Sequence, residues 1–306
     1  MRASKQKGTI QMNSHIDEYT DFMKNTKHKS TNTVESYTRD VAKYITYLGE
    51  LGITEIESTT RTTVLSYMVA LKKCGRAAST LSRTLASIRS FYLFLKDSGF
   101  IDSDPTNALV APHVTKKPPH VLSNADVELL LSQPKLTDNK GIRDKAMLEV
   151  LYATGIRVSE LIGLNIEDVN LAMGYIRCHN NKSERVIPMG GKAVDSLRVY
   201  IGAVRERMIR AQDENALFVN CSGGRISRQG FWKIIKQYQE SSGINTDITP
   251  HSLRHSFAAH LIENGADLQS LKTMMGHADI SSTQVYTCFL DEKIRSVYQK
   301  AHPRAV

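Results

Sequence analysis

The sequence has 306 residues, of which 41% are hydrophobic, so it is long enough for one large or two ordinary domains with buried cores. Lys and Arg number 40 against 31 Asp and Glu, and the formal net charge of +9 favours a polyanionic partner. We find neither an apolar run long enough to span a membrane nor a secretion signal. The four cysteines lack Cys-x-x-Cys spacing, which favours reduced thiols in a cytoplasmic protein.

The N-terminal third of the chain reads as a small helical bundle. Residues 1–13 are polar and basic and are predicted to be disordered. Residues 14–104 then carry apolar stripes at helical spacing, separated by short turns that contain glycine. These stripes predict four helices, near residues 16–23, 34–48, 64–71 and 79–95.

Basic side chains are frequent in this region. Any one of them could simply be a solvated charge, but together with Ser, Thr and Asn they suit contacts to a phosphate backbone. The candidates for nucleic-acid contact are Lys24, Lys27, Lys29, Arg39, Lys43, Arg76, Arg83 and Arg89.

The stretch 105–120 marks a domain boundary. It contains four of the eight prolines, and proline disfavours helical backbone in the residue before it. Lys116 and Lys117 lie here and join the candidates for nucleic-acid contact. A basic, extended linker suits a clamp around a duplex, although a solvated tether has the same composition. We therefore predict an N-terminal helical domain at 14–104 and a C-terminal domain at 121–306.

The C-terminal domain is predicted to begin with two helices. Ser123 followed by Asp126 resembles a capping box, which predicts a helix that ends at Ser132. An apolar-periodic stretch around 146–151 predicts a second helix, which ends at Gly155.

Arg157 stands at the start of the next helix, within the segment Ala-Thr-Gly-Ile-Arg-Val-Ser-Glu-Leu at 153–161. The dipole disfavours a cation at that end of a helix. Glu160, one turn further on, could compensate through a salt bridge, or a bound anion could share the helix end. The salt bridge is the simpler interpretation.

Alternating residues at 175–188 predict a β-hairpin with an Asn-rich turn. Lys182 lies at its tip, where a lysine is usually only solvated. The remaining elements are a short strand at 217–219 and helices at 191–210, 228–241 and 291–300. The fold class is thus mainly α, with a small β-hairpin or sheet in the C-terminal domain.

A polar cluster follows Thr249 and Pro250, which read as a helix start because proline at the first helical position loses no hydrogen bond. His251 and Arg254 are three residues apart and share one face of this helix. The other face carries an apolar stripe of Leu253, Phe257 and Leu261. We expect the helix to bury the stripe and to present His and Arg, which suit phosphate binding and proton transfer.

His251, His255 and His277 also allow a different interpretation, a zinc site. Against it, Arg254 would set a fixed positive charge beside the metal, and no Glu follows His251 as in the zinc-protease motif. We therefore favour an anion site and predict no metal.

Together these motifs resemble those of the tyrosine recombinases, and their combination is most similar to the Xer-type branch. The resemblance covers residues 14–305 and rests on the order of its features. These are the 153–161 segment, the Lys182 hairpin, His251-x-x-Arg254-His255, Met275-Gly276-His277 and Tyr286. The hairpin tip is one residue shorter than is common in Xer-type sequences, and Met275 replaces the usual Leu.

The resemblance implies a two-domain enzyme that closes around double-stranded DNA. It would cleave and rejoin the DNA through a 3′-phosphotyrosyl intermediate, without metal, ATP or another cofactor. Two protomers would bind an inverted-repeat site, and four would act together in synapsis through the C-terminal segment. The implied biological role is resolution of chromosome or plasmid dimers, or integration and excision of a mobile element.

The resemblance also implies roles for individual residues. The non-bridging oxygens of the scissile phosphate would be bound by Arg157, Arg254 and His277. Attack and proton transfer would come from Tyr286 as nucleophile, His251 as general base and Lys182 as general acid. Glu160 would hold the surroundings of Arg157 in place.

Two alternatives keep part of this interpretation. A nicking-closing enzyme like a type IB topoisomerase would use the same chemistry as a monomer without a defined site. A DNA-binding protein without activity would keep the motif residues idle. Covalent adduct formation separates the last alternative from the other two.

Overall fold

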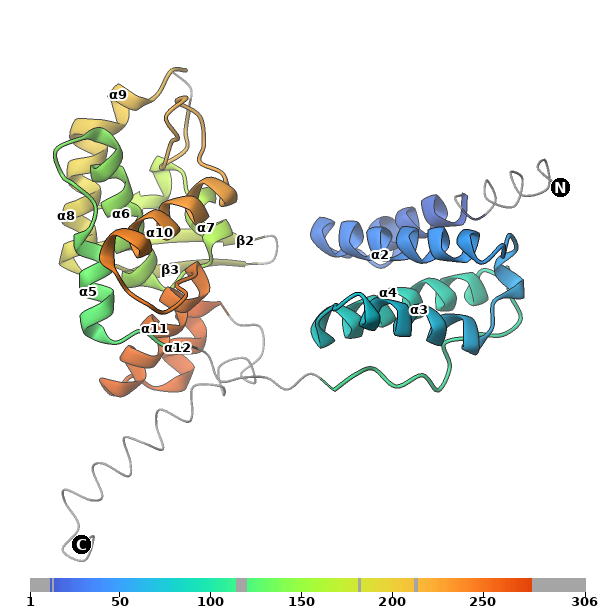
Figure 1. The fold of residues 1–306 in the computed structure, drawn as a ribbon. Coiled ribbons are helices and arrows are strands. Elements are labelled where there is room, and N and C mark those ends of the chain that lie inside the picture. Colours follow the sequence, from blue (N-terminus) through green and yellow to red (C-terminus); the bar gives the residue numbers. More distant parts are fainter. Residues whose placement is uncertain (1–11, 13, 114–119, 181–182, 212–213, 277–306) are drawn as a thin grey trace, which may run out of the picture. The chain divides into compact units, whose positions relative to one another are not determined.

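The computed structural model describes residue 12 and residues 14–113, 120–180, 183–211 and 214–276 (Figure 1). The chain divides into two compact units, Met1–Lys116 and Lys117–Val306. Each unit has its own hydrophobic core. Several predicted features lie outside the described residues: Lys116, Lys117, Lys182, His277, Tyr286, the segment 1–11 and the helix at 291–300.

The N-terminal unit is helical throughout its described secondary structure, as the apolar stripes predict. A helix at 14–21 continues into the π-helical turn η1, and three longer helices follow. Their bounds are η1 Phe22–Thr26, α2 Thr31–Glu50, α3 Arg61–Lys73 and α4 Ala78–Asp97, with the 3₁₀ turn η2 at Ile56–Ser58. Thr60 caps α3, since its side chain accepts from Thr63 N at 3.3 Å. The core is built around the buried aromatic residues Tyr19, Tyr44, Phe91 and Tyr92.

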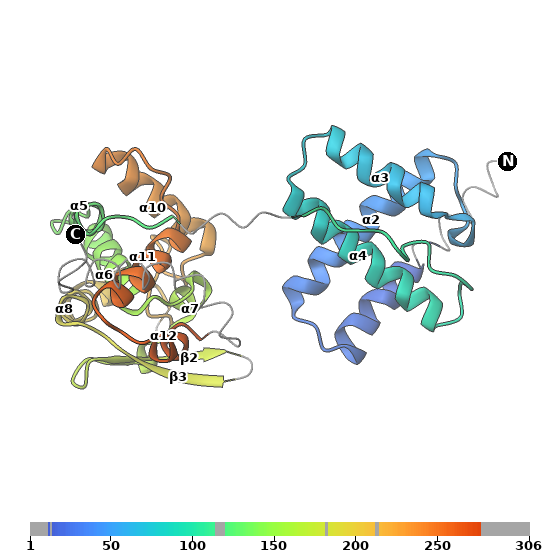
Figure 2. The same ribbon diagram turned by 90° about the horizontal axis from the view of Figure 1, so that it is seen from below.

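The second unit consists of helices with a small antiparallel sheet at one side (Figure 2). Its sheet has the order β1–β2–β3, with Asn180 opposite Ser183 at the end of the predicted hairpin. The strands are β1 Val169–Asn170, β2 Tyr175–Asn180 and β3 Ser183–Pro188. The first helices are α5 Asn124–Ser132, α6 Asn139–Thr154 and α7 Val158–Gly163, followed by the 3₁₀ turn η3 Ile166–Asp168. The later elements are α8 Gly191–Val199, the π-helical η4 Tyr200–Arg205, α9 Glu206–Met208, α10 Arg228–Ser242, α11 Pro250–Glu263 and α12 Leu268–Met275.

Two details of the sheet differ from expectation. Val169–Asn170 forms a third strand, β1, that was not predicted. The stretch at 217–219 is not a strand: Val219 forms an isolated bridge with Arg225, and the preceding Ala216 forms one with Asn165. Residues 216–219 are fully buried. A short apolar run of this kind shows burial but not which neighbour will pair with it.

The predicted helix at 191–210 is present but interrupted, because η4 inserts π-helical backbone between α8 and α9. Helix α12 was not predicted. It begins after Asp267, whose side chain accepts from Ser270 N at 2.8 Å, and it lies against β3 (Figure 2).

Helix α11 starts as predicted, with Thr249 as cap and Pro250 in the first turn. Its expected division into a buried and a presented face is wrong for Arg254, although His251 is exposed. Leu253 and Phe257 are buried, but Arg254 is also only 5% exposed. The reason is that α6 and α12 both pack against α11. Arg254 therefore lies inside the unit.

Candidate active site

The junction between α6 and α7 is fixed by a glycine. Gly155 ends α6 in the left-handed conformation, with φ of 58°. A Cβ at this position would come within 2.1 Å of the Phe257 ring on α11. This close approach brings the Gly155 carbonyl to Arg254, whose Nη1 donates to it.

Arg157 and Glu160 form the predicted salt bridge across the first turn of α7. Arg157 Nη1 donates to Glu160 Oε1 at 3.2 Å, and the backbone N–H of Arg157 donates to Oε2 at 2.7 Å. Glu160 thereby offsets a cation at a helix N-terminus. The Arg157 side chain is 39% exposed, so its guanidinium remains accessible to a ligand.

Arg185 on β3 completes this cluster, and the sequence interpretation missed it. Its Nη1 and Nη2 donate to the two carboxylate oxygens of Glu160 at 2.9 and 2.8 Å. Burial raises the pKa of Glu160, but the hydrogen bonds from Arg185 and from the Arg157 backbone outweigh it, so that the pKa is lowered overall. Glu160 is therefore a carboxylate at neutral pH. The only sequence signal for Arg185 was a basic residue within an alternating strand.

The C-terminal end of α12 joins three arginines from three elements. Met274 O accepts from Arg185 Nε at 3.0 Å, Met275 O from Arg254 Nη2 at 2.7 Å, and Gly276 O from Arg157 Nη2 at 3.1 Å. The last carbonyls of a helix lack partners within the helix and carry its negative dipole end. They therefore suit three neighbouring cations. We call Arg157, Arg185 and Arg254 the arginine cluster.

His251 and His255 lie in the first turns of α11, with ring centroids 6.5 Å apart. His251 is exposed. The pKa of His255 is lowered by burial and by the neighbouring His251 and Arg254, so His255 is neutral at neutral pH. Among the described residues no group of three His, Cys, Asp or Glu side chains is placed to hold a metal ion, and His277 is not among those residues.

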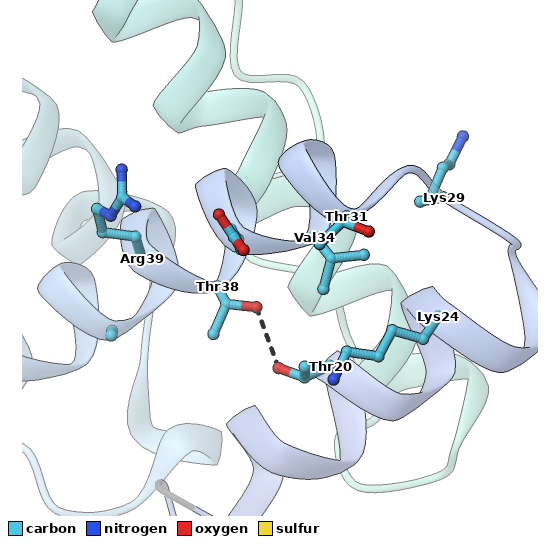
Figure 3. A pocket seen from close by; sticks show the side chains of 9 residues that line it. Thr20, Lys24, Lys29, Thr31, Val34, Thr38 and Arg39 are labelled. Carbon is cyan, nitrogen blue, oxygen red and sulfur yellow. Dashed lines mark hydrogen bonds between the residues drawn. The ribbon is translucent and has the colours of Figure 1, made fainter. Parts of the chain in front are cut away.

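The basic residues of the N-terminal unit fall into two groups. Lys24, Lys29 and Arg39 line one surface hollow of about 640 Å³ between the first helix and α2 (Figure 3). We call these three residues the basic hollow. Lys43 and Arg76 are exposed elsewhere, and the Lys27 ammonium lies 5.5 Å from the Phe22 ring centroid.

Arg83 and Arg89 form the second group, because each of them bonds to another segment of the N-terminal unit. Arg83 forms an ion pair with the buried Asp40, to which Ser87 also donates at 3.1 Å. Arg89 donates to the Leu109 carbonyl at 2.6 Å. These two arginines are also exposed, but they tie α4 to α2 and to the segment around Leu109.

Comparison with known proteins accounts for both units. Residues 120–293 match the model of the phage integrase family, and residues 16–99 match the N-terminal SAM-like domain of phage integrases. The chain is 44% identical to the tyrosine recombinase XerD of Halalkalibacterium halodurans over 296 residues, which cover 96% of this chain and 99% of the relative. It is also 44% identical to XerD of Staphylococcus epidermidis over 295 residues, which cover 96% and 100%.

Solved structures share the fold. The XerH recombinase bound to a palindromic difH substrate aligns with a TM-score of 0.74 at 16% identity, covering 93% of this chain and 84% of that one. The Tn1549 transposon integrase in complex with DNA aligns with a TM-score of 0.73 at 18% identity, covering 92% and 99%. No helix among the described residues is long and apolar enough to cross a membrane. The chain belongs to the phage integrase family and is a tyrosine recombinase, an enzyme that cleaves and rejoins DNA in site-specific recombination.

Proposed function

We propose that Arg157 and Arg254 bind the scissile phosphate and that Tyr286 attacks it. One observation supports the proposal most strongly. Arg157 and Arg254 are 97 positions apart in the sequence, yet Arg157 donates to the Gly276 carbonyl and Arg254 to the adjacent Met275 carbonyl. A phosphodiester is anionic and gains charge in the transition state, so fixed cationic donors stabilise that state. His277 follows Gly276 directly in the sequence and would add a further hydrogen bond.

The remaining roles concern proton transfer. A free phenol has a pKa of about 10, so Tyr286 needs a base or a cationic setting to attack at neutral pH. His251, exposed on α11, would accept the phenol proton, and Lys182 would donate a proton to the departing 5′-oxygen. The new bond joins the Tyr286 oxygen to phosphorus as the bond to the 5′-oxygen breaks. The phosphotyrosyl link keeps the free energy of the phosphodiester, so a 5′-hydroxyl can reverse the step without ATP.

DNA binding would be shared between the two units. The basic hollow, with Lys27, Lys43 and Arg76, would contact phosphates of double-stranded DNA, and Lys116 and Lys117 would extend this contact. The XerH structure contains a palindromic substrate, and a lambda integrase structure is a dimer bound to a core site. These relatives support an inverted-repeat site with two protomers on it, and the resemblance to the Xer-type branch implies four protomers in synapsis. The DNA role and the unpaired thiols of Cys74, Cys178 and Cys221 support a cytoplasmic location.

The segment from 291 onward would connect protomers and thereby deliver Tyr286 only in the assembly. A chain that ends at residue 290 should bind DNA normally but fail to exchange strands. Full strand exchange by this shortened chain would rule out the coupling. Resolution of chromosome or plasmid dimers is the role that the Xer-type resemblance implies, and a mobile-element role would differ only in the DNA site.

The direct test is a covalent adduct on a nicked suicide substrate, from which the 5′-hydroxyl strand diffuses away after cleavage. The wild type should form a protein–DNA adduct that maps to Tyr286, and Tyr286→Phe should form none while binding the same DNA. An adduct in Tyr286→Phe would refute the assigned nucleophile. If the protein relaxed plasmids that lack a recombination site as fast as plasmids that contain one, the nicking-closing alternative would be favoured.

A further inference from the structure

Arg185 has no part in the roles above, yet it is placed as closely as any residue of the site. Its side chain is 9% exposed and its partner Glu160 is 8% exposed. The three hydrogen bonds that the structure describes for its guanidinium go to the site: two to the Glu160 carboxylate and one to the Met274 carbonyl. Burying a cation costs free energy, so the position of Arg185 among these partners needs a specific explanation.

A second observation shows that the backbone is shaped around Arg185. Gly276 ends α12 with φ of 63°, and a Cβ there would come within 2.8 Å of Arg185 Cζ. The guanidinium therefore packs directly against the residue whose carbonyl holds Arg157. Arg185 thus touches both supports of Arg157: the Glu160 carboxylate and the α12 end.

We propose that Arg185 is a positioning residue that sets the orientation of Arg157 for phosphate binding. The proposal rests on the role of Arg157 proposed above. Arg185 occupies both oxygens of Glu160 with a planar fork, so the carboxylate is shared between two cations and cannot turn wholly toward Arg157. Without Arg185 we expect Glu160 to draw the Arg157 guanidinium inward, away from the position of the phosphate.

Arg205, another buried arginine, does not share this geometry. Arg205 is 6% exposed and donates to the Ala216 carbonyl at 3.0 and 2.8 Å, so it also ties a loop to a helix. Its partners include neither Glu160 nor the α12 end among the bonds the structure describes. Arg205→Lys is therefore a matched control for Arg185→Lys: each keeps the charge and loses the fork.

The test compares single-turnover adduct formation on the nicked substrate at saturating DNA, together with DNA affinity and thermal stability. Arg185→Lys should lower the cleavage rate roughly 10–100-fold, the effect of a small misplacement of a reacting group, with DNA affinity changed less than about twofold. Arg205→Lys should cleave like the wild type even where it melts earlier. Equal loss of rate in both variants would mean that Arg185 has a structural role only.

A double-mutant cycle shows whether Arg185 acts through Glu160. The rate losses of Glu160→Gln and Arg185→Lys should be clearly less than additive in free energy, because both act on Arg157. Additive losses would overturn the proposal. A wild type without any adduct would refute the proposed function, whereas wild-type cleavage with unchanged Arg185→Lys would refute only this inference.

A substrate with sulfur in place of the bridging 5′-oxygen separates phosphate binding from leaving-group protonation. A thiolate leaves without a proton, so this substrate restores variants that lack only the general acid. Arg185→Lys should keep its rate loss on it. Full restoration would place Arg185 in support of Lys182, three residues before it in the sequence, and would contradict a role through Arg157.

Discussion

Positive charge is held differently in the two units. In the second unit the arginine cluster is tied by hydrogen bonds to Glu160 and to the last carbonyls of α12. In the N-terminal unit the basic hollow consists of exposed side chains on the surface of a helical bundle. The first arrangement suits stabilisation of a transition state, because its donors are already fixed. The second suits adaptable contact with many phosphates, and salt should weaken it.

The largest effect should come from the most buried member of the arginine cluster. Arg254→Ala removes a guanidinium bonded to Gly155 and Met275, and we expect adduct formation to slow roughly 10²–10³-fold. The measurement is the single-turnover rate at saturating DNA, with circular dichroism to confirm the fold. A folded variant that cleaves at the wild-type rate would remove Arg254 from the site.

A backbone change should show how far the cluster depends on close packing. Gly155→Ala forces a left-handed alanine against the Phe257 ring, and we expect it to destabilise the second unit by about 2–4 kcal/mol. The free energy of unfolding is measured by urea titration. Gly163→Ala is the control, since its Cβ would meet nothing within 4 Å. Equal stability of the two variants would show that the α6–α7 junction tolerates a side chain.

Changes in the N-terminal unit should affect affinity and spare chemistry. Replacing all three residues of the basic hollow by Ala should weaken DNA binding roughly tenfold or more at physiological salt. It should also lower the slope of log affinity against log salt by about 3. Lys96→Ala, an exposed lysine at the end of α4, serves as control. An unchanged salt slope in the triple variant would exclude the basic hollow from DNA contact.

The smallest expected effect is a pH dependence of stability. Because the pKa of Glu160 is lowered in the folded chain, its stabilisation is present above its ordinary value of about 4.5 and is lost as the pH falls below it. Glu160→Gln should therefore show a flatter acid side in a plot of unfolding free energy against pH. Glu128→Gln, which breaks an exposed ion pair with Lys192, should keep the wild-type steepness. The same steepness in Glu160→Gln would contradict the buried cluster.

Local signals predicted local structure well. Ser123 and Thr249 each cap the helix expected after them, and Gly155 ends α6. The salt bridge from Arg157 to Glu160 spans one helical turn, so the sequence contained all of its geometry.

Contacts between distant segments could not be read in the same way. Arg254 is buried because α6 and α12 meet around α11, which no helical periodicity within α11 shows. Arg185 reaches Glu160 from 25 positions away, and Met274 accepts from it although a backbone carbonyl has no sequence signature. The roles of Lys182, His277 and Tyr286 stay predictions that the adduct experiment tests.

We expect that the fixed arginines determine the rate of cleavage and that the exposed basic side chains determine the affinity for DNA. The most direct test measures DNA affinity and the adduct rate at saturating DNA, side by side, for Arg157→Ala and for the triple alanine variant of the basic hollow. We predict that Arg157→Ala loses rate with little change in affinity, and that the triple variant loses affinity with a normal rate at saturation. Equal loss of both quantities in both variants would contradict the account.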